Sequence, residues 1–366
     1  MPIRKFWETY AVQAGDFGAM CRELLNRIPA AKRVASLVVY GSPSGPEEYG
    51  IQRGILDALL CARYGDSVPP FSFIPQKPVT GGLVLEVCLF EADAGSVIAC
   101  REYAGIRYMT IRNSDCRELI TGGCVPAEMA GDTFEQASSV FRNISAIFSR
   151  EGMQVNSIIR QWNYIGEITG DSGGMQHYLR FNLARSRFYD QALWENGYPA
   201  ATATGMDLPA GAVIVRIEAL EAPFATVTNL AINNSLQVAA HRYSAGVLAG
   251  NERALYAPRF ERARLLGAGS HEVVLVSGTA AIRGEQSVAE KDVAEQTRIT
   301  LENMMNLCTS QTEPVFGILV VYLKYARDYA AVKAVIDQSV RALSTVYVEA
   351  GMCREELLVE IEGVAG

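Results

Sequence analysis

The sequence contains two copies of one pattern, and the second copy follows the first after 160 residues. The segment 132–143 recurs as 292–303, with Asp, Glu, Gln and Asn at matching places. Apolar residues share this spacing and recur every third position, which is typical of the buried face of a helix. They are Phe141, Ile144 and Ile147 in the first copy and Leu301, Met304 and Leu307 in the second. A repeat of this length predicts that two parts of the chain fold alike.

Strand-like segments flank each predicted helix. A strand ending in a glycine turn precedes it, at 119–123 and 275–279, and the segments after it (Ile158 and Ile318) read as a buried strand. A second helix and a closing strand follow, with the closing strand at 215–219 and 359–363. This alternation predicts an α+β fold in which helices cover one face of a mixed sheet.

The length of 366 residues suits two or three domains of about 150 residues each. We expect the first copy to span 116–222 and the second to span 223–366. Residues 1–115 match neither copy clearly and form an N-terminal segment that could hold a third, degenerate copy. Two or three pseudo-equivalent domains could then close a pseudo-trimeric ring within one chain.

The composition argues against several classes of binding partner. The net charge of −7 without a run of Lys or Arg argues against nucleic acid. The longest apolar runs are far shorter than the roughly 18 residues of a membrane span, and the first residues lack the apolar stretch of a secretory signal. Eight scattered cysteines without CxxC spacing and three histidines argue against a metal site. We therefore expect a cytoplasmic protein with reduced thiols, no metal and no membrane partner.

The two copies differ on the closing strand, where the first has Arg216 and the second has Glu360. Because side chains alternate along a strand, Glu360 and Glu362 share one face. Two such carboxylates suit an exposed edge of a sheet. They equally suit a pocket in which one of them is a general acid with a raised pKa.

Several segments resemble the RidA (YjgF) superfamily, namely 276–284, the 292–303 helix and 357–362. More narrowly, the chain is similar to the chorismatases, which carry two RidA-like domains in one polypeptide. The narrower resemblance is carried, in the family's order, by 162–165, 178–185, 199–202 and 234–263, the last of which includes Tyr256. It covers roughly residues 115–366.

The resemblance implies an activity. Chorismatases cleave the enolpyruvyl ether of chorismate into pyruvate and a hydroxybenzoate or a dihydroxycyclohexadienoate, and they need neither a metal nor an organic cofactor. Their catalytic acid is a glutamate on the last strand, a role that falls here on Glu360. Cys353 falls in the family's cysteine position near the substrate ring.

The residue types suit that chemistry. An enol ether is cleaved by protonating its terminal CH₂, so the acid must hold a proton near neutral pH, well above the usual glutamate pKa of about 4.3. Chorismate carries two carboxylates, which require cations and hydrogen-bond donors. The candidates in segments that match the family are Arg185, Arg262, Lys324, Tyr243 and the backbone amides of Gly278 and Thr279. In this interpretation the second copy builds the pocket, while the first copy is a scaffold.

Two other functions stay open. The chain could be a RidA-type deaminase of enamines or imines, but the family's carboxylate-binding arginine has no counterpart in the window 345–349. It could also be a non-catalytic module that binds a small ligand, because RidA clefts form where neighbouring domains meet. The partner expected for the chorismatase-like interpretation is a small-molecule substrate, chorismate or a similar carboxylate, and the protein is expected to be a monomer or a small homo-oligomer.

Overall fold

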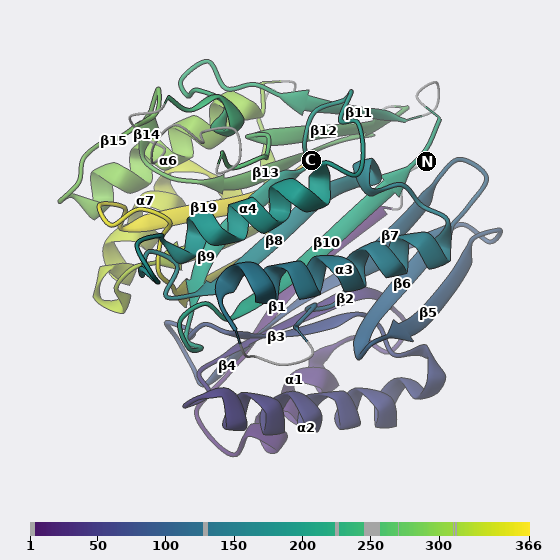
Figure 1. The fold of residues 1–366 in the computed structure, drawn as a ribbon. Helices are drawn as coiled ribbons and strands as arrows, with labels where there is room; N and C mark the ends of the chain where they lie inside the picture. Colours follow the sequence, from purple (N-terminus) through teal and green to yellow (C-terminus); the bar gives the residue numbers. More distant parts are fainter. Residues whose placement is uncertain are drawn as a thin grey trace.

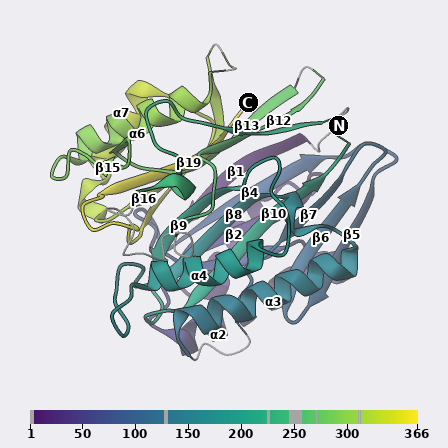
Figure 2. The same cartoon turned by 45° about the horizontal axis from the view of Figure 1, so that its top comes forward.

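The structure is a computed structural model, and it consists of three similar units packed around a common centre. Each unit is a mixed sheet with a pair of helices on its outer face, as Figures 1 and 2 show from two directions. The structure describes residues 4–126, 131–223, 227–244, 257–269, 271–309, 311 and 313–366. Tyr256, part of one segment that carries the family resemblance, lies outside the described residues.

The middle unit contains the first predicted copy. Its sheet has the strand order β5-β6-β7-β10-β8-β9, and α3 and α4 pack together on one side of it. The elements are β5 (Val97–Tyr103), β6 (Ile106–Arg112), β7 (Arg117–Thr121), α3 (Thr133–Glu151), β8 (Ile158–Gly166), α4 (His177–Tyr189), β9 (Ala200–Met206) and β10 (Val213–Glu221).

The third unit contains the second predicted copy. The path through its sheet is β11-β12-β13-β19-β16, and β16 also pairs with β17 and β18. The elements are β11 (Thr228–Ile232), β12 (Ala263–Ala268), β13 (His271–Thr279), α6 (Val293–Leu307), β16 (Val315–Leu323), α7 (Tyr329–Ser339), β17 (Arg341–Ala342), β18 (Thr345–Glu349) and β19 (Val359–Ala365). A small hairpin, β14 (Ile282–Arg283) and β15 (Gln286–Ser287), follows β13.

The first unit occupies the N-terminal segment. Its sheet has the strand order β1-β4-β2-β3, with α1 and α2 packed together outside it. The elements are β1 (Arg4–Val12), α1 (Phe17–Arg27), β2 (Arg33–Gly41), α2 (Pro46–Tyr64), β3 (Phe71–Pro75) and β4 (Leu83–Glu91).

All three units share one connectivity. Four strands of each unit follow one pattern: the first is β1, β7 or β13, the second is β2, β8 or β16, the third is β3, β9 or β18, and the last is β4, β10 or β19. The first pairs antiparallel with the last, the last pairs antiparallel with the second, and the second pairs parallel with the third. The α+β class with mixed sheets and helices on one face is thereby confirmed. The N-terminal segment has this connectivity too, although its residues do not align with the repeat.

One expected boundary differs from the structure. Strands β5 and β6 lie before residue 115, but they pair with each other and then with β7 of the middle sheet. The first unit therefore ends with β4 at Glu91, because the chain after it joins the next sheet.

The repeated helices form where the sequence predicts them, for a local reason. Asp132 caps α3 by accepting a hydrogen bond from the Glu135 amide, and the Glu135 side chain accepts one from the Asp132 amide in return. Asp292 accepts from the Glu295 amide at the start of α6. The six predicted apolar positions of these helices are buried against their sheets.

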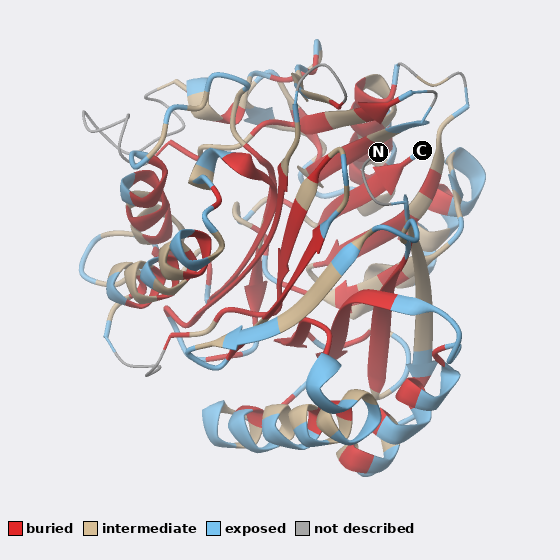
Figure 3. Cartoon of the chain, turned by 90° about the vertical axis from the view of Figure 1, so that its right-hand side faces the viewer, coloured by how far each residue is buried: buried red, intermediate tan, exposed pale blue. Residues whose placement is uncertain are grey.

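The three units form a closed ring. The third strand of each unit lies beside the first strand of the next or the turn after it, as the contact between β9 and β13 shows. At the other two junctions, Gly123 N donates to Phe71 O (3.0 Å) and Ser344 Oγ donates to Trp7 O (3.0 Å). The sheets face inward and are buried, whereas the helices present exposed faces to the outside (Figure 3).

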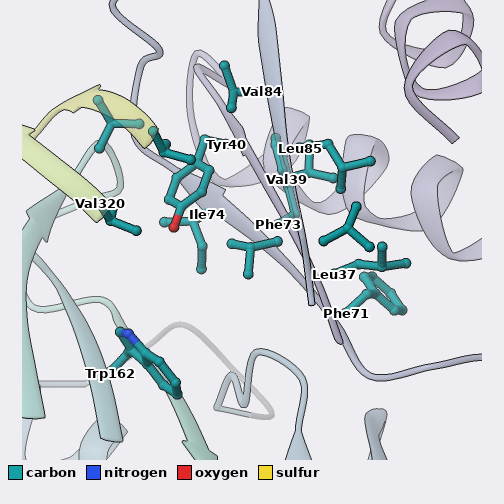
Figure 4. Close-up of a cluster of buried hydrophobic side chains, with 14 of the residues drawn as sticks. Leu37, Val39, Tyr40, Phe71, Phe73, Ile74, Val84, Leu85, Trp162 and Val320 are labelled. Carbon is teal, nitrogen blue, oxygen red and sulfur yellow. The ribbon is translucent and has the colours of Figure 1, made fainter. Parts of the chain in front are cut away.

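The centre of the ring mixes apolar and polar side chains. One buried cluster joins Tyr40 of the first unit to Trp162 of the second and Val320 of the third (Figure 4). Beside it lies a cavity of about 550 Å³, which is lined by residues of all three units. Because this space lies between three sheets of one chain, the ring is complete without a second copy.

Candidate active site

A second cavity, of about 400 Å³, lies where the middle and third units meet. Its walls come from α4 and β9 on one side and from β13, β19 and the segment before β19 on the other. The two units are joined here by backbone hydrogen bonds, such as that from Gly205 N to Gly351 O (2.7 Å). The pocket is therefore an interface between the two copies, and the first copy contributes side chains to it as well as support.

Glu360 lies in this pocket and is 5% exposed. It is held against the backbone of Gly278, where a side-chain Cβ would overlap the Glu360 carboxyl oxygen Oε1. The Gly278 amide donates to Thr202 Oγ1 (3.0 Å) on β9 and so joins the two units. The absence of a side chain at residue 278 is what admits the carboxyl group.

Glu362, two residues further along β19, is also buried, with 3% exposure. Its carboxylate forms an ion pair with Arg160 Nη2 (2.8 Å) and accepts hydrogen bonds from Trp162 Nε1 (2.9 Å) and Tyr322 OH (3.0 Å). Thr202 Oγ1 also donates to it. Because both glutamates are buried, they are not a pair at an exposed edge of the sheet.

The surroundings of Glu360 favour its neutral form. Burial raises its pKa most, the nearby Glu362 carboxylate raises it further, and Arg262 opposes both, so that the pKa stands at about 8. At neutral pH this buried side chain carries a proton. A carboxylic acid in this state can donate a proton to a bound molecule.

Cationic side chains face the same pocket. Arg262 is 4% exposed and donates through Nη2 to Val238 O (3.0 Å) and to the Tyr243 hydroxyl. Arg185 is 1% exposed and donates to Asn182 Oδ1 (2.7 Å). The Nε atoms of both arginines are buried without a hydrogen-bond partner. Such groups retain the capacity to bind an anion.

Cys353 and Tyr178 also line the pocket. Burial and the neighbouring Glu360 raise the pKa of the Cys353 thiol to about 12. Burial likewise raises the pKa of the Tyr178 hydroxyl. Both groups stay protonated at neutral pH, so Cys353 lines the pocket as a neutral thiol and is not poised as a thiolate nucleophile.

Most of the predicted site residues come together in this pocket. Those that line it are Arg185, Tyr243, Arg262, Gly278, Cys353 and Glu360. Two others lie outside its lining. Thr279 turns its hydroxyl to Ser277 O (2.8 Å), and Lys324 pairs with Glu355 (3.0 Å) at the surface. The Gly278 amide, a candidate donor only where the turn leaves it free, is bound to Thr202.

Sequence reasoning missed several lining residues as site residues, among them four polar ones. Tyr178 and Asn182 come from α4, Thr202 from β9, and Arg354 from the segment before β19. Arg354 stands beside Cys353, and the other three lie in segments that carry the family resemblance. The sequence gives no sign that these three residues lie near Glu360, because they belong to the middle unit and Glu360 belongs to the third.

Substitution of Gly278 by Ala is expected to displace the Glu360 carboxyl group, because the new Cβ would occupy its place. We expect any reaction that uses Glu360 as an acid to slow by about 10²-fold or more. Fold stability should change less, because Gly278 does not need a left-handed backbone. Turnover and thermal unfolding of the variant measure the two effects, and full activity would contradict this placement of the acid.

Among the described residues, no group of three or more His, Cys, Asp or Glu side chains is arranged to hold a metal ion. The eight cysteines carry free thiols. In the described parts of the chain, every helix is too short or too polar to cross a membrane.

Comparison with known proteins identifies relatives of this chain. The family described as "Chorismatase FkbO/Hyg5-like, N-terminal" matches residues 105–217. A 3-hydroxybenzoate synthase of Streptomyces hygroscopicus is 31% identical over 229 residues, which cover 57% of this chain and 63% of that protein. A chorismatase of the same organism is 26% identical over 261 residues, covering 66% of this chain and 70% of the relative. The first alignment thus spans less than two thirds of the relative's length.

The fold has a solved counterpart over its whole length. A crystal structure of a chorismatase superposes with a TM-score of 0.72 and 18% identity, covering 100% of both chains. The sequence matches and this superposition agree with the resemblance carried by residues 115–366. Residues 105–217 are thus similar to the chorismatase FkbO/Hyg5-like N-terminal family, and the fold of the whole chain is similar to that of a solved chorismatase.

Proposed function

We propose that this protein cleaves the enolpyruvyl ether of chorismate, releasing pyruvate, with Glu360 as the general acid. The observation that carries the proposal is a buried carboxyl group with a pKa of about 8 in a pocket that also holds buried arginines. This pairing suits a substrate that brings two carboxylates and needs one proton.

Three arginines are available for the substrate carboxylates. Arg185 and Arg262 lie buried in the lining, and Arg354 stands close by with its guanidinium 5.2 Å from the Tyr243 ring centre. We propose that Arg185 and Arg262 bind the carboxylates and that Tyr243, which accepts a hydrogen bond from Arg262, orients the ring. Lys324 is a weaker candidate, because Glu355 already holds its ammonium group.

The reaction then needs few groups from the protein. Glu360 protonates the terminal CH₂ of the enol ether, and the adjacent carbon becomes an oxocarbenium ion. Attack on that carbon by water, followed by loss of the ether oxygen, gives pyruvate and a dihydroxycyclohexadienoate. Attack by a ring hydroxyl, followed by elimination and loss of a ring proton, gives pyruvate and a hydroxybenzoate. Both routes balance without an oxidant or reductant.

The direct test is to incubate the purified protein with chorismate and to measure pyruvate with a coupled assay. Stoichiometric pyruvate, with a hydroxybenzoate or dihydroxycyclohexadienoate identified by mass spectrometry, supports the proposal. A thermal shift with chorismate but no pyruvate would replace it with a ligand-binding role. Ammonia released from 2-aminoacrylate, without pyruvate from chorismate, would indicate a deaminase.

The pH dependence follows from the raised pKa of Glu360. Its acidic form is the active one, so kcat/KM should be constant below pH 8 and fall about tenfold per pH unit above it. The rate should fall on the alkaline side because a raised pKa keeps the carboxyl group protonated up to a higher pH. Initial rates of pyruvate release between pH 6 and about 10 test this prediction, and a decline centred near the ordinary glutamate value of 4.5 would contradict it.

A further inference from the structure

Glu362, two residues after the proposed acid on β19, has a counterpart in each of the other two units. On the last strand of each unit, Glu86, Glu218 and Glu362 stand opposite matching residues of the second strand, namely Val38, Arg160 and Val320. All three glutamates line the central cavity. The residues two places earlier on these strands are Val84, Arg216 and Glu360, so only the third unit has a carboxyl group at this position.

The donors to Glu362 make it an unusually well anchored anion. Arg160 and Trp162 reach it from β8, Thr202 from β9 and Tyr322 from β16, so that the middle unit supplies three of its four partners. The Arg160 side chain is 2% exposed and also donates to Val276 O (2.6 Å). Removed from water and ion-paired, this carboxylate exerts a field that solvent screens little.

We propose that Glu362 is a positioning residue for the reaction: a fixed carboxylate, anchored across the unit interface, that keeps Glu360 in its acidic form between turnovers. The proposal rests on the proposed function of Glu360. Strand alternation places both side chains on the same face of β19. Thr202 donates to Glu362 and accepts from the amide of Gly278, the residue against which Glu360 packs. Ionising Glu360 would set a second negative charge beside the first in a site of low dielectric constant.

Other groups around Glu360 also affect whether it is protonated, some favouring its neutral form and some its charged form. Arg262 opposes Glu362 most directly, and Cys353 stays neutral. The remaining charged or titratable groups of the pocket are Arg185, Arg354, Tyr178, Tyr243, Glu355 and Glu356. Glu355 is turned to the surface, where Lys324 neutralises it. Glu362 is therefore the nearby anion whose removal should change the acid most.

The test compares Glu362→Gln with Glu218→Gln, a matched control. Glu218 occupies the same place in the ring and is ion-paired with Lys5 (3.0 Å), but its neighbour on the strand is Arg216. For Glu362→Gln we expect the alkaline limb of kcat/KM to move about one pH unit or more toward acid. For Glu218→Gln the limb should stay in place, even where the variant is less stable. An unmoved limb in Glu362→Gln overturns the proposal.

A single substitution leaves Arg160 buried without its partner, so the double variant Arg160→Met/Glu362→Gln repeats the test with both charges removed. Such replacements of a buried pair are often tolerated. A smaller acidward shift is expected, because the Arg160 charge that opposes Glu362 is removed as well, and an unmoved limb again overturns the proposal.

Infrared titration provides a readout without turnover. The band of the protonated Glu360 carboxyl group is identified by its absence in Glu360→Gln. In Glu362→Gln this band should titrate at a lower pH than in the wild type. If the wild type releases no pyruvate, the proposed function fails, and this band alone decides whether Glu362 holds the proton on Glu360.

Discussion

Glu360→Gln is expected to lower the rate of pyruvate release from chorismate by about 10²–10⁴-fold. The amide keeps the size of the side chain and its neutral state, so the pocket and the KM should change little, while the transferable proton is lost. Because Glu360 has less than a tenth of its surface exposed, no bulk acid replaces it directly. Steady-state kinetics at pH 7 measure the effect as a loss in kcat.

Glu355→Gln is the matched control. Glu355 lies at the rim of the same pocket, and hydrogen bonds from Thr169 and Lys324 lower the pKa of its carboxyl. It is ionised at neutral pH and cannot act as the acid, so most activity should remain. Equal activity in wild type and Glu360→Gln would remove the acid from the proposal.

The same substitution has a signature in stability. The pKa of Glu360 is raised on folding, so wild-type stability falls as the pH rises from 4.5, the ordinary value, to about 8. Glu360→Gln lacks this titration. Its free energy of unfolding relative to the wild type should therefore increase across that interval, as urea unfolding at several pH values can measure.

Arg160→Met should have the largest effect on stability. It leaves Glu362 buried without its cation, and breaking a buried ion pair from one side costs about 3–5 kcal/mol. We expect about 3 kcal/mol, the lower end, because Trp162, Thr202 and Tyr322 still donate to the carboxylate. Urea unfolding at pH 7 measures the change in the free energy of unfolding.

Arg298→Met provides the contrast. Arg298 pairs with Glu295 (2.6 Å) on the surface of α6, where both side chains are about half exposed. A surface pair contributes at most about 1 kcal/mol, so this variant should unfold close to the wild type. If Arg160→Met were no less stable than Arg298→Met, the buried pair would not hold the units together as described.

The repeated helices could be predicted because their signals are local. The Asp and Glu of each cap and the apolar positions of each helix lie within one short segment, and the structure confirms both helices. The first unit could not be recognised in this way. Its strands pair in the same pattern as the others, but the pairing depends on backbone hydrogen bonds and buried apolar residues, which many sequences satisfy.

The site was predictable in part for a similar reason. Glu360 and Glu362 are two residues apart on one strand, so alternation alone places them together. Asn182 and Thr202 join them only because β9 of one unit packs beside β13 of the next, which no local pattern reports. Lys324 was a candidate because its segment matches the family, but its flexible stem carries the ammonium group out to Glu355.

Because one polypeptide makes all three units, each wall of the central cavity can change by itself. In a ring of identical subunits, an acid introduced beside the inner glutamate would appear three times, and six carboxyl groups would crowd about a single axis. Here Val84 and Arg216 occupy the matching positions of the other two units. Only the third unit therefore has the repulsion between two carboxyl groups on its last strand. Covalent fusion thus allows a reactive group that a symmetric assembly would have to tolerate in triplicate.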